Sequence, residues 1–284
     1  MKSVECHAVI DSPALAQRFG IRCAADSVFQ RLIDRILGVF QFSKLHRLAD
    51  LSRARTSTRD HIENFRRALE ISVRLVHGDT SAVGERGQPL VVISNHPYGI
   101  LDSVIALENL LTRRDDVLVL TNVMLSHVRL CTQHLLWVDP RPRCKGSPEN
   151  VRSLLRAVRH VRRGGCLLFF PAGRCSHFQL DNGKWLIQDP PWHPHLARLI
   201  SLTSAPVLPM YFQGRNSALF CVGGAFSESF RSLLLLRELL RRRGTSIHFA
   251  VGSVITSKTL LELPPAARMV ILRNATYSLG RRGT

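Results

Sequence analysis

The chain has 284 residues and 45% of them are hydrophobic, which is enough for one large α/β domain or for a domain with a helical extension. Its 39 Lys and Arg residues against 21 Asp and Glu give a formal net charge of +18, which favours nucleic acid or an anionic membrane surface as a partner. Seven dispersed cysteines without a CxxC pair indicate reduced cytosolic thiols and argue against a disulfide framework. No apolar run reaches 18 residues and the first residues lack a signal-peptide core, so we expect neither a spanning helix nor a leader.

The first 80 residues are predicted to form an N-terminal helical pair. Apolar residues recur at helical spacing from Val28 to Phe40, and Ser27 is suited to cap that helix. A second helix is expected from Thr58 to His77, ending at Gly78. The apolar stripes either pack on the core or on each other, or the first helix lies in a membrane interface over residues 28–48. Both alternatives stay open on the sequence.

Strand and helix patterns alternate after a loop at residues 78–89. Such alternation predicts an α/β domain over residues 81–284, with a mixed sheet flanked by helices. The expected strands are Leu90–Ser94, Val117–Thr121, Leu135–Val138, Cys166–Phe170, Pro206–Phe212 and Ser246–Val251. The expected helices are Asp102–Leu111, Asn122–Thr132, Pro148–Arg163, His193–Thr203, Ser229–Arg243 and Pro265–Gly280.

A histidine and an aspartate follow the first of these strands, in the segment Asn-His-Pro-Tyr-Gly-Ile-Leu-Asp at residues 95–102. Pro97 disfavours helical geometry at His96, so the histidine is expected at the end of the strand. Gly99 permits a tight turn, after which Asp102 lies near the start of the next helix. A carboxylate that accepts one imidazole N–H leaves the other nitrogen free as a general base. The alternative is that Asp102 only caps the helix and that His96 is an ordinary loop histidine.

Two further predicted strands also end in glycine and polar residues. The strand at 166–170 leads into Pro-Ala-Gly-Arg-Cys-Ser at 171–176, and the strand at 206–212 leads into Gln-Gly-Arg-Asn-Ser at 213–217. Ligands in open α/β sheets bind beyond the carboxyl ends of strands, where Arg174 would suit a phosphate or a carboxylate. A strand-ending turn with a solvated arginine is the alternative for that segment. We expect the three strand ends to converge on one site.

These segments resemble the glycerolipid acyltransferase family, which transfers acyl groups to lysophospholipids and related acceptors. The resemblance runs from about Leu90 to Ile255 and is strongest to a bacterial hemolysin-like branch, some members of which act in ornithine-lipid synthesis. His96 and Asp102 match the family's His…Asp motif. Other matches are Phe170–Arg174 to a Phe-Pro-Glu-Gly block, Val207–Pro209 to a Val-x-Pro block, and Asp189-Pro-Pro-Trp-His-Pro, Gly214–Phe220 and Arg237–Leu240 to the branch itself.

The chain departs from the family pattern at two places. Five residues separate His96 from Asp102, one more than in the family, and Gly99 is the residue expected to absorb the difference. Ala172 stands where the family has a glutamate, so a carboxylate expected to bind the acceptor is missing. The identity of the acceptor is therefore not carried over from the better-known glycerol-phosphate enzymes.

The resemblance implies that His96 takes a proton from an acceptor hydroxyl as it attacks an acyl thioester, while Asp102 orients the ring. The expected donor is acyl-CoA or an acyl carrier protein thioester, the expected acceptor is a lysophospholipid or lyso-aminolipid, and no cofactor or metal is expected. We expect peripheral binding to anionic lipid on the cytoplasmic face of the inner membrane, with the acidic acyl carrier protein as a further candidate partner. The residues expected to bind substrate are Asn95, Gly99, Pro171, Gly173, Arg174, Ser176, Pro209, Arg215 and Asn216.

Other functions and chemistries remain open on the sequence. An esterase or thioesterase is one alternative, although the chain has no G-x-S-x-G elbow. A nucleic-acid-binding protein is another, disfavoured by 7% aromatic residues and by the lack of a basic stripe or a recognisable motif. Cys175 and Ser176 are nucleophiles by type but have no base at a recognisable spacing. His127, Cys131 and His134 share a predicted helical face that would suit zinc, but no fourth ligand is evident.

Overall fold

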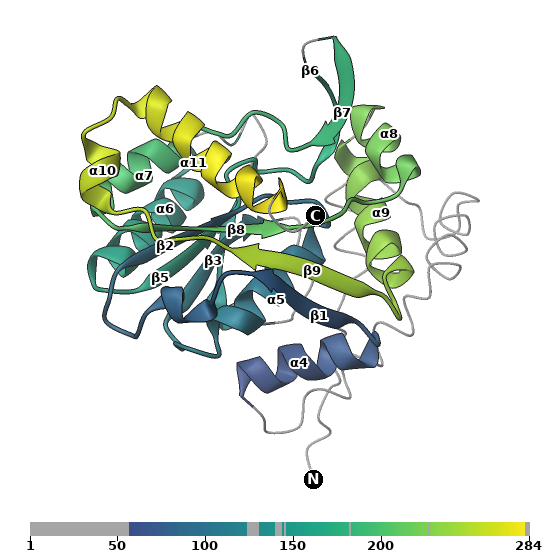
Figure 1. Cartoon of the computed structure of the whole chain (residues 1–284), viewed down its shortest axis with the longest axis horizontal. Coiled ribbons are helices and arrows are strands. Elements are labelled where there is room, and N and C mark those ends of the chain that lie inside the picture. The colour runs from purple at the N-terminus through teal and green to yellow at the C-terminus, as the bar shows by residue number, and fades with distance from the viewer. Residues whose placement is uncertain are drawn as a thin grey trace.

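A seven-stranded sheet forms the centre of the computed structural model, which describes residues 57–123, 131–139, 144, 146–181, 183–226 and 228–281 (Figure 1). The strands lie in the order β1-β9-β8-β2-β5-β3-β4. Those from β8 to β4 run parallel, whereas β9 is antiparallel to β8 and β1 is parallel to β9. The predicted mixed sheet is therefore confirmed. Its strands are β1 Ser72–His77, β2 Leu90–Ser94, β3 Val117–Asn122, β4 Leu135–Val138, β5 Cys166–Phe169, β8 Val207–Phe212 and β9 Ser246–Val251.

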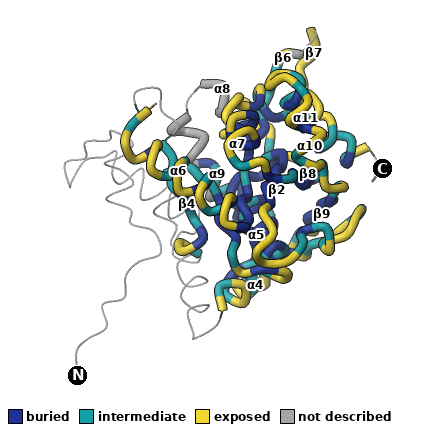
Figure 2. Tube along the Cα trace, turned by 90° about the vertical axis from the view of Figure 1, so that its left-hand side faces the viewer, coloured by how far each residue is buried: buried dark blue, intermediate teal, exposed yellow. Residues whose placement is uncertain are grey.

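Helices cover both faces of the sheet (Figures 1 and 2). On one face lie α4 (Thr58–Ala68) and α5 (Ile100–Leu110). On the other lie α6 (Pro148–Arg162), α7 (His195–Thr203), α10 (Ser257–Leu261) and α11 (Pro265–Arg281). Helices α8 (Ala218–Phe226) and α9 (Glu228–Arg241) lie beside a separate hairpin of β6 (His177–Asp181) and β7 (Lys184–Gln188). None of the helices in the described part of the chain is long and apolar enough to cross a membrane.

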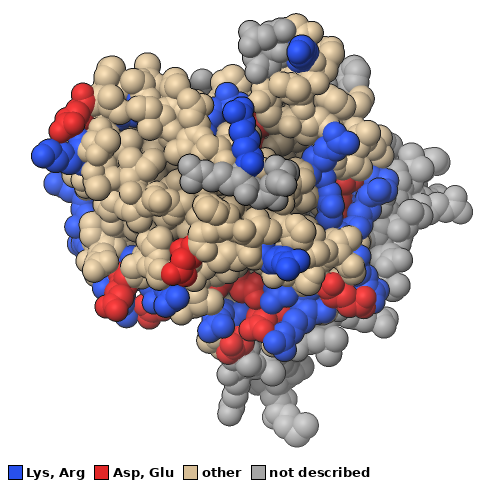
Figure 3. Space-filling model, viewed as in Figure 1, with Lys and Arg blue, Asp and Glu red and all other residues tan. Residues whose placement is uncertain are grey.

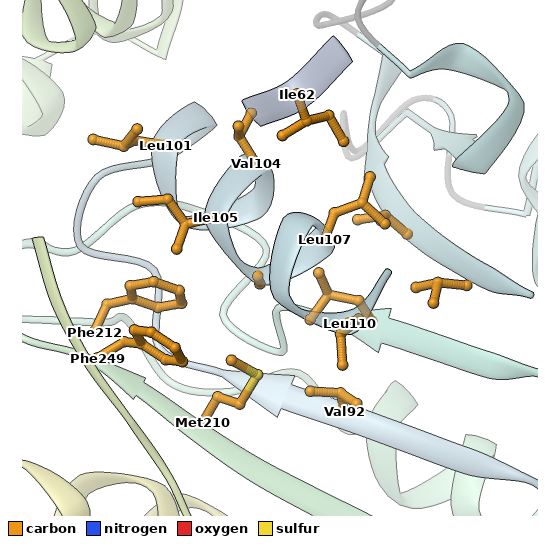
Figure 4. Packing of buried hydrophobic residues seen from close by; sticks show 14 of the residues in the cluster. Ile62, Val92, Leu101, Val104, Ile105, Leu107, Leu110, Met210, Phe212 and Phe249 are labelled. Atoms are coloured by element: carbon orange, nitrogen blue, oxygen red, sulfur yellow. The ribbon is translucent and has the colours of Figure 1, made fainter. Parts of the chain in front are cut away.

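Alternate residues of the buried strands supply two hydrophobic cores. In β2, Val92 faces the core under α4 and α5, whereas Ile93 faces the core under α6, α7 and α11. Because side chains alternate between the faces of a strand, a strand buried on both sides has a continuous apolar sequence, as β2 does. Figure 4 shows the first core, where the rings of Phe212 and Phe249 stack 5.8 Å apart on the side of the sheet that α5 covers.

The elements with strong periodicity occur where the sequence predicts them. All six predicted strands are present: β2, β4 and β9 have the predicted bounds, and β3, β5 and β8 each differ by one residue at one end. Helices α5, α6, α7, α9 and α11 match within two residues at either end. The helix predicted at 28–40 lies outside the described residues, as does most of the helix predicted at 122–132, whose end is a short 3₁₀ turn at Thr132–His134.

The second N-terminal helix is predicted wrongly in its C-terminal half. Helix α4 ends at Ala68, and the next residues form β1, which pairs in parallel with β9. The chain reverses through Glu70, whose φ is 55°, and the carbonyl of Leu69 accepts the N–H of Gly244 at 3.1 Å. Without β1, β9 would be an edge strand with unpaired backbone groups, and pairing it outweighs the helical propensity of this segment. Residues 72–77 thus join the sheet although they precede the predicted domain boundary at residue 80.

Substitution of Gly78 tests how closely the end of β1 approaches β9. Its φ is +84°, and a Cβ there would lie 1.8 Å from the carbonyl oxygen of Val251. We expect Gly78→Ala to lower the free energy of unfolding by more than the roughly 1–3 kcal/mol that a left-handed backbone alone costs a side chain. Equilibrium urea denaturation measures the loss. Gly87→Ala is the matched control, since Gly87 has a φ of +91° and open space around it. Equal losses in the two variants would contradict the close approach.

Candidate active site

Three loops meet at one edge of the sheet, where the parallel strands β2, β5 and β8 end. Because β2 pairs with β5 on one side and β8 on the other, the three C-terminal ends lie side by side, as expected. The side chain of Asn95 accepts the N–H of Phe212 at 2.7 Å and donates to its carbonyl at 2.9 Å, which ties the loop after β2 to β8. The N–H of Ser176 donates to the carbonyl of His96 at 2.9 Å, which ties it to the loop after β5.

His96 and Asp102 lie in contact within the loop after β2. Nδ1 of His96 is 2.9 Å from Oδ2 of Asp102. That distance suits a hydrogen bond, but Nδ1 makes no well-formed hydrogen bond with the described residues. Such bonds are often poorly aligned in active sites without substrate and tighten when substrate binds. The imidazole is 14% exposed and the carboxylate is fully buried, so a solvent-accessible ring lies against a buried carboxylate.

The local sequence explains how Asp102 reaches His96. Gly99 precedes α5 with a φ of +82°, and a Cβ there would collide with side chains of α9 and of the loop after β5. Asp102 lies in the first turn of α5 and accepts the backbone N–H groups of Tyr98 and Gly99, each at 2.9 Å. Unpaired N–H groups and the helix dipole favour a carboxylate at this position. The same side chain therefore caps the helix and contacts His96, and the extra residue is accommodated at the turn.

The surroundings of Asp102 act on its charge in opposite directions. Burial raises the pKa of the carboxyl above its ordinary value, whereas the His96 contact and the N–H groups of Tyr98 and Gly99 oppose that shift. These contacts favour the ionised form that would stabilise an imidazolium. The ring of Phe170 covers another side of the histidine, with its centroid 4.3 Å from that of the imidazole.

Asp189 is a second buried carboxylate beside His96, and it is absent from the residues that the sequence predicts for the site. It is 1% exposed. Its Oδ1 accepts the backbone N–H of His96 at 3.1 Å and the hydroxyl of Ser176 at 2.6 Å, and its Oδ2 accepts the indole N–H of Trp192 at 3.2 Å. It joins the loops after β2 and β5 to the segment after β7. The signal in the sequence is the Asp-Pro-Pro-Trp block, which indicates a family branch but no contact.

The predicted substrate-binding residues occupy different depths in the three loops. Gly173, Arg174 and Arg215 are exposed, whereas Pro171 is buried. Pro209 is buried inside β8, where it pairs with β2, rather than at the end of the strand. The two prolines are thus buried structural residues. Among the predicted substrate-binding residues, Arg174 and Arg215 are the charged ones, and both face solvent.

Buried amide atoms of Asn216 and Gln213 lack hydrogen-bond partners among the described residues, in the loop after β8. Asn216 is 3% exposed, yet neither its Oδ1 nor its Nδ2 has a hydrogen-bond partner in the described part of the chain. The same holds for Nε2 of Gln213. The hydroxyl of Tyr98 donates to the carbonyl of Gln213 at 2.6 Å, which places the start of this loop against the His96 loop. Because leaving buried polar groups unpaired is costly, a polar ligand here would be stabilised.

The structure gives less support to a serine or cysteine nucleophile and to a zinc site. The hydroxyl of Ser176 donates to Asp189, not to a histidine, and Cys175 is buried. Nδ1 of His134 lies 2.7 Å from a backbone carbonyl, burial raises the pKa of Cys131 to about 12, and His127 lies outside the described residues. Among the residues that the structure describes, no group of three potential metal ligands is found.

The burial of Asp189 predicts a pH dependence of stability. Burial raises its pKa, against the hydrogen bonds from Ser176, His96 and Trp192. A carboxyl whose pKa is raised by folding contributes stability below its unfolded pKa, and the contribution is lost as pH rises through the folded pKa. The free energy of unfolding of the wild type minus that of Asp189→Asn should therefore fall as pH rises above about 4, and then become constant. Urea denaturation across a pH series measures this difference.

Asp116→Asn provides a control of opposite sign. Burial tends to raise the pKa of Asp116, but the ion pair with Arg114, at 2.6 Å, outweighs it and the pKa is lowered. The free energy of unfolding of the wild type minus that of Asp116→Asn should rise with pH, because the contribution of Asp116 to stability is lost as pH falls through its folded pKa. A difference for Asp189→Asn that rises with pH would contradict the burial of Asp189.

Comparisons with known proteins bear on the identity of this site. A family model described as Acyltransferase matches residues 72–238, more than half of the chain and all three loops. No curated protein sequence matches. Among solved structures, the chain is similar to the crystal structure of the 1-acyl-sn-glycerophosphate (LPA) acyltransferase PlsC from Thermotoga maritima, with a TM-score of 0.44 and 12% identity over 82% of this chain and 86% of that chain. The extent of the family match shows that this chain belongs to the acyltransferase family.

Proposed function

We propose that the protein transfers a fatty acyl group from an acyl thioester to the hydroxyl of a lysophospholipid or lyso-aminolipid, with His96 as general base. The observation that carries this proposal is the 2.9 Å contact between Nδ1 of His96 and the buried Oδ2 of Asp102 at the end of β2, in a chain of the acyltransferase family. A carboxylate beside one imidazole nitrogen, with the ring accessible to solvent, is an arrangement suited to general-base catalysis.

The proposed reaction assigns one role to each nitrogen of the imidazole. Asp102 lies 2.9 Å from Nδ1 and is proposed to accept its N–H in a hydrogen bond when substrate tightens the contact, which leaves Nε2 as the basic nitrogen. Nε2 takes the hydroxyl proton of the acceptor as its oxygen attacks the thioester carbonyl. Asp102 stabilises the imidazolium, and the ring returns the proton to the leaving thiolate. Acyl transfer of this kind involves no net oxidation or reduction, so the proposed reaction needs no redox cofactor.

The polar part of a substrate is proposed to bind at the loop after β8 and at the exposed arginines. The amide of Asn216 and the Nε2 atom of Gln213 are buried without partners among the described residues. Arg174 and Arg215 are exposed cations on two of the three loops. Guanidinium groups suit phosphates, which acyl-CoA, the prosthetic group of acyl carrier protein and many lysolipids contain. The net charge of +18 supports docking of the acidic carrier protein or of an anionic bilayer on the cytoplasmic side of the cell membrane.

The roles of His96 and Asp102 can be tested by substitution. His96→Ala is expected to lower kcat about 10²–10⁴-fold, the usual contribution of a general base, without unfolding the protein. Asp102→Asn should also slow transfer, because the amide does not stabilise an imidazolium. Transfer of labelled acyl groups to a lysolipid gives the rates, and circular dichroism checks the fold.

Glu108→Gln is the matched control for these variants. Glu108 is a buried carboxylate on the same helix as Asp102, but it pairs with Arg66 at 2.8 Å, away from the site. Its variant should keep the wild-type rate when folded. Wild-type turnover by His96→Ala would remove His96 from the mechanism. Release of free fatty acid without any acceptor would instead favour a thioesterase.

The proposed role of Asn216 predicts an effect on activity without a matching effect on stability. Asn216→Ala should lower kcat/KM about 5- to 150-fold, because a missing hydrogen bond to substrate costs about 1–3 kcal/mol. Its unfolding free energy should change little, since its amide atoms have no protein partners to lose. Asn150→Ala should do the reverse: that amide bonds Asp139 and Cys144 at 2.8 Å, far from the loops in sequence. Unchanged kinetics in Asn216→Ala would contradict the role.

A further inference from the structure

A hairpin lies between Ser176 and Asp189, the two hydrogen-bonded residues beside His96. Ser176 immediately precedes β6, Asp189 immediately follows β7, and the two side chains are joined at 2.6 Å. The hairpin between them projects from the body of the protein beside α8 (Figure 1). A hairpin of these two strands is fixed at its base by the site, so whatever its tip contacts is brought close to His96.

One face of the hairpin is apolar along its whole length. Phe178 pairs across the strands with Ile187, and Leu180 pairs with Trp185. Since residues two apart on a strand face the same side, these four side chains form one surface. At the base, Phe178 and Ile187 pack on the small core that contains Phe220. At the tip the surface has no such cover: Leu180 is 61% exposed and Trp185 is 67% exposed.

The neighbouring helix also exposes large apolar side chains. Helix α8 packs against β6, and its Leu219 and Val222 are 49% and 46% exposed. Large side chains that are this exposed and lie close together mark an interaction site far more often than isolated ones do. Tryptophan favours the boundary between a bilayer and water, where its ring is buried and its N–H stays hydrated.

Cations lie at the tip and near the base of the hairpin. Lys184, at the start of β7, is exposed. Arg174 and Arg215 are exposed on the two loops that border the hairpin. In Figure 3, further Lys and Arg side chains lie on the side of the molecule where Figure 1 places α9. An apolar tip with cations around its base matches an anionic bilayer, which offers acyl chains beneath a layer of negative headgroups.

We infer that the tip of the β6–β7 hairpin inserts its Leu180 and Trp185 side chains into an anionic lipid bilayer. The inference rests on the proposed function, which supplies a substrate that resides in a bilayer. Insertion would hold the loops that carry His96, Ser176 and Asp189 at the membrane surface, so that a lysolipid reaches the base without leaving the interface entirely. An acidic protein partner would be attracted by the cations but would leave the apolar tip without a complementary surface.

The first test compares binding to vesicles. The double variant Leu180→Gln/Trp185→Gln is expected to bind vesicles of phosphatidylglycerol and phosphatidylethanolamine about tenfold or more weakly than the wild type in flotation, because two apolar side chains no longer enter the bilayer. Val151→Gln/Leu155→Gln is the control, since these residues of α6 are also apolar and 42% and 47% exposed, but lie away from the hairpin. Equal flotation of both double variants and the wild type would overturn the inference.

The second test needs no disruptive substitution. Vesicles that contain brominated acyl chains should quench tryptophan emission of the bound wild type, and this quenching should be lost in Trp185→Phe, which keeps Trp137 and Trp192. Quenching that persists unchanged in Trp185→Phe, or no quenching of the bound wild type, would mean that the tip contacts something other than lipid, such as another part of this chain or a protein.

Acyl transfer to a monomeric, short-chain lysolipid separates the inference from the proposed function. The hairpin variant should transfer to this soluble acceptor as fast as the wild type while transferring more slowly to acceptors in vesicles. A wild type that transfers to neither acceptor would refute the proposed function, and the flotation and quenching results would still decide the inference. Equal rates of wild type and variant on vesicles would overturn the inference and leave the proposed function intact.

Discussion

Two buried carboxylates hold the loop that carries His96, and the geometry of the site depends on them. Asp102 accepts the N–H groups of Tyr98 and Gly99 and lies 2.9 Å from the imidazole, while Asp189 accepts the N–H of His96 itself. Burying a carboxylate is costly unless hydrogen bonds compensate for the lost water. Each carboxylate thus requires the loop to present its backbone donors in one arrangement, and that arrangement fixes the histidine at the end of β2.

The sheet determines which segments the carboxylates can join. Parallel neighbours β5, β2 and β8 end at the same edge, so loops that are distant in sequence become adjacent there. Asn95 then binds both backbone groups of Phe212, and Ser176 binds both the carbonyl of His96 and the side chain of Asp189. In the proposed function these contacts orient the base before substrate arrives, which is how a positioned group lowers a barrier.

The parts of the fold that follow from local pattern could be predicted from the sequence, and those that depend on distant partners could not. The continuous apolar run of β2 and the spacing of α6 specify those elements by themselves. Strand β1 is stabilised by its pairing with β9. The sequence of residues 69–78 contains no local signal of that distant pairing. The β6–β7 hairpin is a different case, because Asn182-Gly183 between alternating apolar residues is a recognised turn signal from which the hairpin could have been predicted.

The candidate site shows the same division. His96 and Asp102 lie in one segment, so a strand end, a proline and a glycine indicate that they are near each other, although the same pattern also fits Asp102 as a helix cap alone. Asp189 acts from 93 residues away, and its role as an acceptor for the His96 N–H depends on folding of β6 and β7 between them. The unpartnered amide of Asn216 likewise emerges only when the packing around it is known.

Acyl transfer by the purified wild type tests the central claim most directly. Labelled acyl-CoA and acyl carrier protein thioester would each be offered with lyso-ornithine lipid, lysophosphatidic acid and lysophosphatidylethanolamine. We expect an acylated lipid product from at least one pair of donor and acceptor, formed in proportion to enzyme and dependent on the free hydroxyl of the acceptor. Folded protein that yields no acylated lipid from any pair, while releasing free fatty acid or leaving the thioester intact, would contradict it.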